Sequence, residues 1–225
     1  MFFVGHISLA FLIIYCISIK FPRVTKNVSI PLIMLLSIFP DVDIVLEFAG
    51  VDLGHRTFTH SIIIWLGIGG TVIFLISLKA RRGSEAAIYL IAYMSHLVIG
   101  DILVEHINVL YPIGDFTIDS TIRSSSLQHI SLEAALIGLM AAVVIIKFKH
   151  RKKEPSFFSY HGIVDSFLYL LLVLAISISV IYVLNKFQLD LAHALILIML
   201  HSSAIAIVTL LWVKSKGTER QQHLV

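Results

Sequence analysis

Residues 86–110, AAIYLIAYMSHLVIGDILVEHINVL, form an apolar run long enough to cross a bilayer. The same run contains four side chains that can carry charge, those of His96, Asp101, Glu105 and His106. Ionisable side chains are costly at membrane depth, and by default they mark a functional site there. This stretch therefore predicts a membrane helix with a functional site built into it.

The composition of the rest of the chain is also that of a membrane protein. Hydrophobic residues make up 58% of the 225 residues and charged residues 14%, and the mean hydropathy is +0.94. A soluble domain does not need this much apolar surface. The single cysteine, Cys16, excludes a disulfide framework and a thiolate metal site. The net charge of +3 comes from loop Lys and Arg, so we expect membrane lipids as partners and no nucleic acid.

Seven apolar runs predict the fold. They lie at residues 2–19, 28–39, 59–78, 86–110, 130–146, 163–185 and 190–213. The second run is short and meets Pro40, a residue that a helix interior does not tolerate. We therefore expect an all-α, polytopic transmembrane helix bundle of about seven membrane segments, one of them short or broken. Residues 1–225 form a single transmembrane domain in this prediction.

The basic residues predict the orientation of the bundle. Fourteen of the 17 Lys and Arg residues follow the first, third, fifth or seventh run, and only Arg56, Arg123 and Lys186 lie elsewhere. Because cytoplasmic loops are enriched in Lys and Arg, this pattern predicts seven crossings with the N-terminus outside and the C-terminus inside. The alternative is six crossings with a re-entrant second run, which breaks the alternation of charged loops.

Two acidic residues follow the short second run, in the motif Pro40-Asp41-Val42-Asp43. A proline that ends a helix at membrane depth frees backbone groups, which must find partners in protein or in a wet cavity. Two carboxylates at such a break can bind one ion or two adjacent ions, as hard and borderline divalent metals prefer. The alternative is a turn with solvated aspartates.

Two histidines bracket the entrance of the third run, His55 and His60. Between them Arg56 can hold a substrate anion, because guanidinium suits phosphate and carboxylate groups. Thr59 is expected to cap the helix that follows. The alternative is an interfacial loop in which the histidines are incidental.

The spacing within the fourth run is awkward for a shared ion. Asp101 follows His96 by five residues, which places it about 140° around an ideal α-helix. Both side chains can bind one ion if the helix is locally distorted, and Gly100 permits such a distortion.

Further candidates lie near the start of the first and fifth runs. His129 and Glu133 are four residues apart, so they share one helical face, where they can bind a metal or where Glu133 can act as a base. His6 lies one turn into the first run. By contrast, His193 and His201 in the last run are expected mainly to hydrogen-bond between helices.

These motifs in combination resemble those of a known family, the YdjM-like membrane-bound metal-dependent hydrolases. The resemblance covers roughly residues 1–120 and rests on Gly5-His6, Pro40-Asp41-Val42-Asp43, His55-Arg56, Thr59-His60-Ser61, Ser95-His96, Asp101 and Tyr111-Pro112. It implies a multi-span membrane protein with a metal-dependent hydrolase activity. One departure concerns the aspartate four residues after the histidine, because this chain has Gly100 there and Asp101 next.

A more distant similarity is to zinc-dependent phospholipase C and related nucleases. The order His96, Asp101, His106, His129 and Glu133 is similar to that of their metal ligands. This similarity implies two or three zinc ions and a phosphodiester substrate.

The sequence thus predicts a metal-dependent hydrolase in the cell membrane, with its site in the outer half of the bilayer and a lipid or phosphoester-type substrate. We expect one to three divalent ions, zinc above all. The candidate metal ligands, concentrated in residues 1–133, are His6, Asp41, Asp43, His55, His60, His96, Asp101, His106, His129 and Glu133. The candidate catalytic residues are Asp43, Glu133 and Arg56. A transporter or channel with a midplane polar site, and a non-catalytic regulatory protein with a structural metal, are the alternatives.

Overall fold

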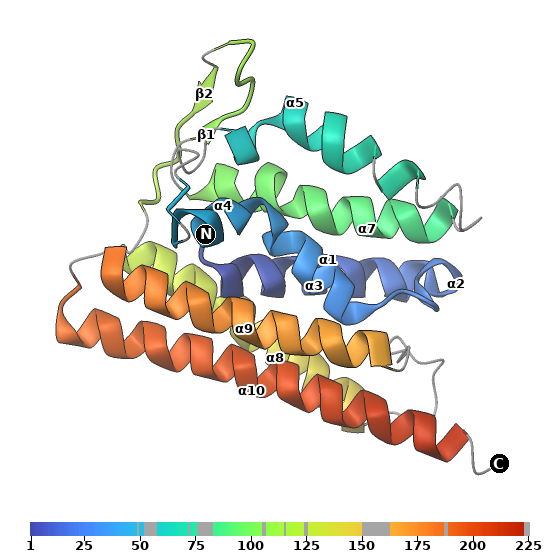
Figure 1. The fold of residues 1–225 in the computed structure, drawn as a ribbon. Helices are drawn as coiled ribbons and strands as arrows, with labels where there is room; N and C mark the ends of the chain where they lie inside the picture. Colours follow the sequence, from blue (N-terminus) through green and yellow to red (C-terminus); the bar gives the residue numbers. More distant parts are fainter. Residues whose placement is uncertain are drawn as a thin grey trace.

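The computed structural model is almost entirely helical. It describes residues 1–48, 50–51, 58–71, 73–75, 83–104, 107–114, 116–123, 126–149, 163–186 and 189–222. In Figure 1 the long helices lie alongside one another, and the two termini lie at opposite ends of the bundle.

The elements follow the predicted apolar runs. In the first half they are α1 (Phe3–Lys20), α2 (Pro22–Thr25), α3 (Ile30–Ile38), η1 (Phe39–Asp41), α4 (Val42–Phe48), η2 (Phe58–His60), α5 (Ile62–Ile64), η3 (Trp65–Gly70), α7 (Gly83–Ser95) and η4 (His96–Asp101). In the second half they are β1 (Ile107–Asn108), β2 (Thr117–Ile118), α8 (Leu127–Lys149), α9 (Ile163–Lys186) and α10 (Leu191–Gln222).

The short second segment ends where its proline predicts. Ser29 caps α3 by accepting a hydrogen bond from the Leu32 amide, and α3 ends at Ile38. Pro40 has no N–H to continue the α-helical ladder, so the chain tightens into the 3₁₀ turn η1 before α4 begins. This break turns Asp41 into the bundle, where it is buried.

One part of the fourth run is not helical, contrary to the prediction for residues 86–110. The π-helix η4 ends at Asp101, and Ile107 and Asn108 pair with β2 as an antiparallel strand. Ile107 is fully buried, and the Val109 carbonyl accepts a hydrogen bond from the Ile62 amide. The end of the run thus joins a hairpin that packs over the start of α5.

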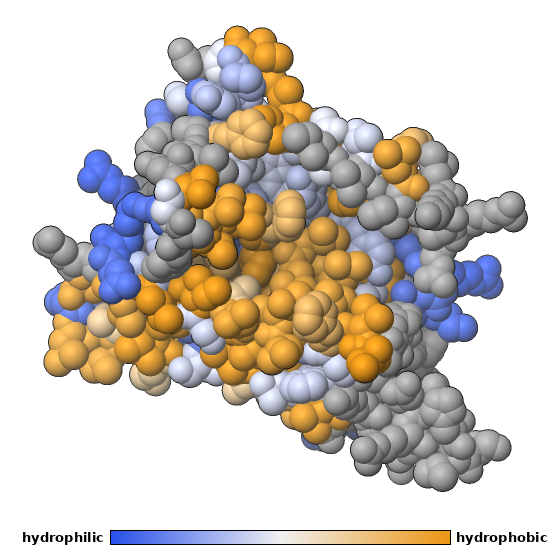
Figure 2. Space-filling model, in the orientation of Figure 1, coloured by the Kyte–Doolittle hydropathy of each residue, from blue (hydrophilic) through white to orange (hydrophobic). Residues whose placement is uncertain are grey.

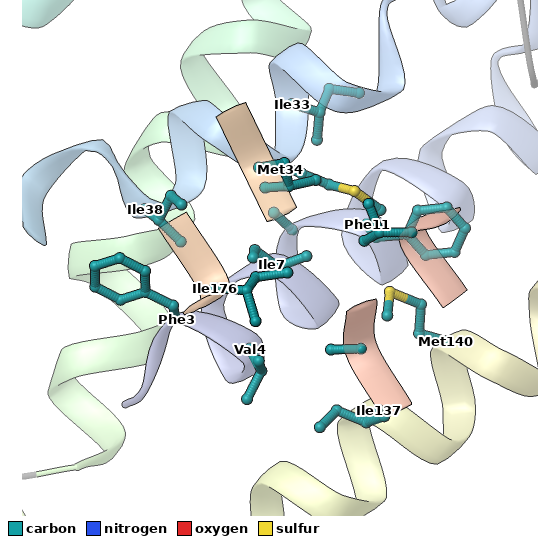
Figure 3. Packing of buried hydrophobic residues seen from close by; sticks show 14 of the residues in the cluster. Phe3, Val4, Ile7, Phe11, Ile33, Met34, Ile38, Ile137, Met140 and Ile176 are labelled. Carbon is teal, nitrogen blue, oxygen red and sulfur yellow. The ribbon is translucent and has the colours of Figure 1, made fainter. Parts of the chain in front are cut away.

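The core is built around one face of α1. Val4, Ile7, Phe11 and Ile14 recur three or four residues apart and are all fully buried. Figure 3 shows that side chains of α3, α8 and α9 surround this face. Lipid tails are as apolar as these side chains, so close van der Waals packing holds the helices together.

The outer surface confirms an all-α membrane protein. Among the described residues, four helices are long and apolar enough to span a bilayer, at Phe3–Lys20, Leu127–Lys147, Ile163–Lys186 and Leu191–Val213. Figure 2 shows an apolar surface across the middle of the bundle, with hydrophilic residues at its left and right ends. Segments α3 and α7 with η4 are shorter and pack against α1, and η3 packs on α7 through Trp65 and Tyr93.

Candidate metal centre

Five ionisable side chains from four elements meet at the end of the bundle where α1 begins. They are His6 on α1, Asp41 on η1, His60 on η2, and His96 and Asp101 on η4. Each is at most 3% exposed. The sequence predicts all five as ligands, and the structure brings them together.

Four of them direct ligand atoms toward one another. The Nε2 atoms of His60 and His96 lie 3.2 Å apart, and Asp101 Oδ2 lies 3.2 and 3.1 Å from them. Asp41 Oδ1 lies 3.3 Å from His60 Nε2 and 3.5 Å from His96 Nε2. Asp41 Oδ1 and Asp101 Oδ2 thus each lie within 3.5 Å of both imidazole nitrogens.

These separations suit a divalent metal. Zinc binds imidazole nitrogen and carboxylate oxygen at about 2.0–2.2 Å, so two ligands at a tetrahedral angle lie about 3.3–3.6 Å apart. The five distances of 3.1–3.5 Å fall on or near this range. Because the donors are imidazoles and carboxylates, zinc or a similar divalent ion fits this set.

Unsatisfied polar atoms also point to an ion. Both ring nitrogens of His6, Oδ2 of Asp41 and Oδ2 of Asp101 are buried and make no hydrogen bond within the described part of the chain. Two buried carboxylates this close to each other are costly without a compensating cation. The Met1 amino group, 3.4 Å from Asp101 Oδ1, compensates only part of their charge.

A π-helical turn brings Asp101 to the face of His96. Residues His96–Asp101 form a π-helix, in which hydrogen bonds join residues five apart. The wider turn returns the fifth residue to the same face, whereas an α-helix would place it about 140° away. The distortion that the spacing requires is therefore present, and such turns are frequent at functional sites.

Gly100 admits His6 into this centre. A Cβ at position 100 would overlap the His6 ring, closer than real Cβ contacts allow. The His6 ring stacks on that of His96, with centroids 3.6 Å apart, and His6 Nε2 lies 3.5 Å from Asp101 Oδ1. His6, Asp41 and His96 form a second group of three candidate ligands that overlaps the first.

The far side of the His60 ring is held by a hydrogen-bond relay. The Thr59 hydroxyl lies 2.9 Å from His60 Nδ1 and donates to Asp43 Oδ2 at 2.6 Å. The Ile44 amide donates to Asp43 Oδ1 at 2.8 Å. Asp43 thus lies behind His60, and the relay keeps the His60 Nε2 lone pair directed at the other ligands.

His96 is oriented by a main-chain carbonyl. Its Nδ1 lies 2.7 Å from the carbonyl oxygen of Ser37, in the last turn of α3. Carbonyls in the last turn of a helix have no partner within it, so this oxygen can accept from the imidazole. The contact leaves His96 Nε2 to the ligand cluster.

Comparison with known proteins identifies the family. The family model described as YdjM inner membrane protein matches residues 1–213. The chain belongs to this family. No curated protein and no solved structure matches it. The YdjM match extends beyond the resemblance over residues 1–120 and includes α9 and α10 up to Val213. The protein is accordingly an integral inner membrane protein.

The predicted pair on the fifth run of this YdjM-family chain lies beside the centre. Glu133 Oε1 lies 3.1 Å from His129 Nε2. The same oxygen accepts a hydrogen bond from the Phe2 amide at 2.6 Å. Glu133 Oε2 is buried and makes no hydrogen bond to the residues that the structure describes. A Cβ on Gly5 would lie 2.5 Å from Glu133 Oε1, so this carboxylate packs against the turn of α1 that carries His6.

Three predicted site residues, His55, Arg56 and His106, lie outside the described residues.

The predicted helix cap at Thr59 is wrong. Ser61 caps α5 instead, because its hydroxyl accepts a hydrogen bond from the Ile63 amide at 3.2 Å. Thr59, the predicted cap, instead holds His60.

The sequence reasoning missed two supports of the centre. Trp65 donates its indole N–H to the Thr59 carbonyl, and Ser37 supplies the carbonyl for His96. Because Ser37 contacts His96 through its backbone carbonyl, the identity of the Ser37 side chain does not predict this contact. The position of Trp65 six residues after Thr59 is the only sequence clue to the first contact.

Proposed function

We propose that this YdjM-family protein is a metal-dependent hydrolase embedded in the membrane, acting on a lipid or phosphoester-type substrate. The observation that carries the proposal is that a carboxylate oxygen of Asp41 and one of Asp101 each lie 3.1–3.5 Å from the buried Nε2 atoms of both His60 and His96. If these side chains served only to pack the core, apolar side chains would do so at a lower energetic cost.

A bound zinc or similar ion would act as a Lewis acid on the scissile group and make a bound water acidic enough to attack near neutral pH. His60, His96, Asp41 and Asp101 would hold it, and His6 would complete the overlapping group. Every other role falls to the chain itself.

The remaining roles follow from the contacts. Both Asp43 oxygens already accept hydrogen bonds, so Asp43 orients His60 through Thr59. Glu133 has one buried oxygen that makes no hydrogen bond to the described residues, and this oxygen could accept a proton from the attacking water. Arg56, four residues before His60 in the chain, would stabilise the anionic transition state.

The site would face outward in a seven-crossing bundle. It lies at the end of the bundle where α1 begins, away from Lys20 at the end of α1, Arg23 in α2 and Lys147 near the end of α8. The positive-inside rule assigns the Lys- and Arg-rich end to the cytoplasm. A centre at the opposite end is within reach of outer-leaflet head groups.

Metal content is the first test. Elemental analysis of the purified protein should find at least one equivalent of divalent metal in the wild type and a loss in His60→Ala and His96→Ala. His193→Ala is the matched control, because His193 pairs with Asp190 at 2.8 Å away from the ligand cluster. Wild-type protein without stoichiometric metal would overturn the proposal.

Hydrolysis is the second test. Phospholipids with labelled head groups should be cleaved by the wild-type protein, and a chelator should abolish cleavage until zinc is restored. A protein that holds the metal but cleaves no phosphoester or carboxylic ester of a lipid would have a structural metal site instead.

A further inference from the structure

A pocket with two charged residues in its lining lies between α4 and α9. It has a volume of about 230 Å³ and is lined by Glu47 of α4 and by Tyr182, Asn185 and Lys186 of α9. No role in the proposed mechanism uses these residues.

The lining of this cavity presents both signs of charge. Lys186 Nζ donates to Glu47 Oε1 at 3.3 Å, and the two side chains are 51% and 39% exposed. The same Nζ lies 5.6 Å from the centroid of the Tyr182 ring. An ion pair this exposed contributes little to stability, so both charges can exchange their contacts for those of a ligand.

The cavity lies at the end of a candidate membrane span and one helical turn from Asp43. Lys186 is the last residue of the membrane span Ile163–Lys186, so it marks the boundary of the apolar region. Glu47 follows Asp43 by one turn of α4, about 6 Å along the helix axis. Asp43 in turn supports His60 through Thr59.

Exposed apolar side chains continue from the cavity along α9. Ile181 and Leu184 are exposed, and both lie within the membrane span Ile163–Lys186. Ile181 is one helical turn before Asn185, on the same side of α9. Acyl chains can pack along this side of the span, which favours a lipid over a free, water-soluble phosphoester.

We propose that this cavity binds the head group of a zwitterionic phospholipid with a primary ammonium, such as phosphatidylethanolamine. Lys186 and Asn185 would bind the phosphate, and Glu47 and the Tyr182 ring would bind the ammonium. Glu47 disfavours a purely anionic head group by like-charge repulsion. The binding of the lipid does not depend on the proposed hydrolase function. Only the identification of this lipid as the substrate rests on that function.

Lipid binding tests the inference without turnover. The full-length wild-type protein, treated with a chelator, is titrated in detergent with dihexanoyl phosphatidylethanolamine or dihexanoyl phosphatidylglycerol, and bound lipid is counted by native mass spectrometry. We expect about tenfold preference for the ethanolamine lipid, because its ammonium adds a charged contact. Equal binding of the two lipids would overturn the proposal.

Two variants separate the charges. Glu47→Gln should bring the two lipids to equal affinity, because the repulsion of the anionic head group and the contact to the ammonium are both removed. Lys186→Gln should weaken both lipids about equally. A pair that only joins α4 to α9 would alter thermal stability and leave the lipid preference unchanged, which contradicts the proposal.

Lys147→Gln is the matched control. Lys147 also lies 5.6 Å from a tyrosine ring centroid, that of Tyr15, but at the other end of the bundle. Its loss should leave lipid binding at the wild-type level, and a loss of preference in this variant would assign the effect to net charge.

The two proposals fail separately. A lipid preference that persists in a protein without metal or hydrolysis overturns only the hydrolase. Hydrolysis by a protein whose preference ignores Glu47 and Lys186 overturns only the head-group site.

Discussion

Gly100 and Gly5 each make room for a polar side chain that belongs to another helix. The missing Cβ of Gly100 admits the His6 ring, and that of Gly5 admits the Glu133 carboxylate. Neither glycine has a left-handed backbone that would require it. At the residue scale, close approach between helices therefore explains both glycines, as it does for small residues in membrane bundles generally.

Replacing Gly100 with alanine should displace His6. The added methyl has no space beside the imidazole, so we expect a loss of stability of about 1–3 kcal/mol and weaker metal binding. Thermal unfolding in detergent and metal titration measure the two effects. Gly138→Ala on α8 is the control, because no atom lies within 4 Å of its Cβ position and alanine favours helix. Wild-type metal affinity in Gly100→Ala would contradict the packing argument.

The hydroxyl of Thr59 should matter more than its methyl. Thr59→Val removes the link between His60 and Asp43 with little change in shape, so we expect metal affinity about 10–100-fold lower. Thr59→Ser keeps the hydroxyl and should keep most of the affinity. Competition with a coloured zinc chelator measures the metal affinity of both variants. Equal affinities for the valine and serine variants would show that the Thr59 hydroxyl does not support the ligand His60.

At the scale of elements, two departures from the α-helix build the centre. The 3₁₀ turn η1 follows from Pro40 and turns Asp41 inward. The π-turn η4 accommodates one extra residue between His96 and Asp101 and sets both on one face. Irregular backbone at membrane depth persists only where protein or a wet cavity satisfies it, and here it carries ligands.

Deleting Ile99 should preserve the centre. The deletion places Asp101 four residues after His96, which an ordinary α-turn brings to the same face. Ile99 is 38% exposed, so the loss of its side chain costs little packing. We expect wild-type metal stoichiometry by elemental analysis, with the π-turn replaced by an α-turn.

An alanine inserted after Ile99 provides the opposite case. It places Asp101 six residues after His96, a spacing that neither helix type returns to one face, so metal should be lost. Metal retained by the insertion variant and lost by the deletion variant would show that the helix register does not position Asp101.

At the scale of the whole molecule, the bundle separates its chemistry from its basic residues. The ligand cluster, the β1–β2 hairpin and the head-group cavity lie at the end of the bundle where α1 begins. Basic residues gather at the opposite end, where α1 and α8 end and where α2 lies. They include Lys20, Arg23, Lys26 and Lys149. Because cytoplasmic loops are enriched in Lys and Arg, we expect this basic end of the bundle to face the cytoplasm.

Cysteine labelling in intact cells tests this orientation. In a Cys16→Ser background, Gly114→Cys in the hairpin should react with a membrane-impermeant maleimide, since no atom lies within 4 Å of a Cβ there. Lys26→Cys, between α2 and α3, should react only after lysis. The reverse pattern would place the centre on the cytoplasmic side.

The amino-acid sequence by itself determined the class of the protein and the residues of its centre. Long apolar runs separated by basic loops identify a helical membrane protein, because the bilayer demands about 20 apolar residues per span. His6, Asp41, His60, His96 and Asp101 stand out because they lie within these runs or directly after one, where charge is costly.

Only the tertiary structure decided which groups face an ion and which support them. Asp41 and Asp43 are equivalent by type and nearly adjacent, yet Asp41 faces the imidazoles while Asp43 lies behind His60. That choice depends on a proline turn, on a π-turn and on how closely helices from distant parts of the chain approach. Sequence periodicity describes one helix at a time, whereas a binding site is defined by distances between several helices.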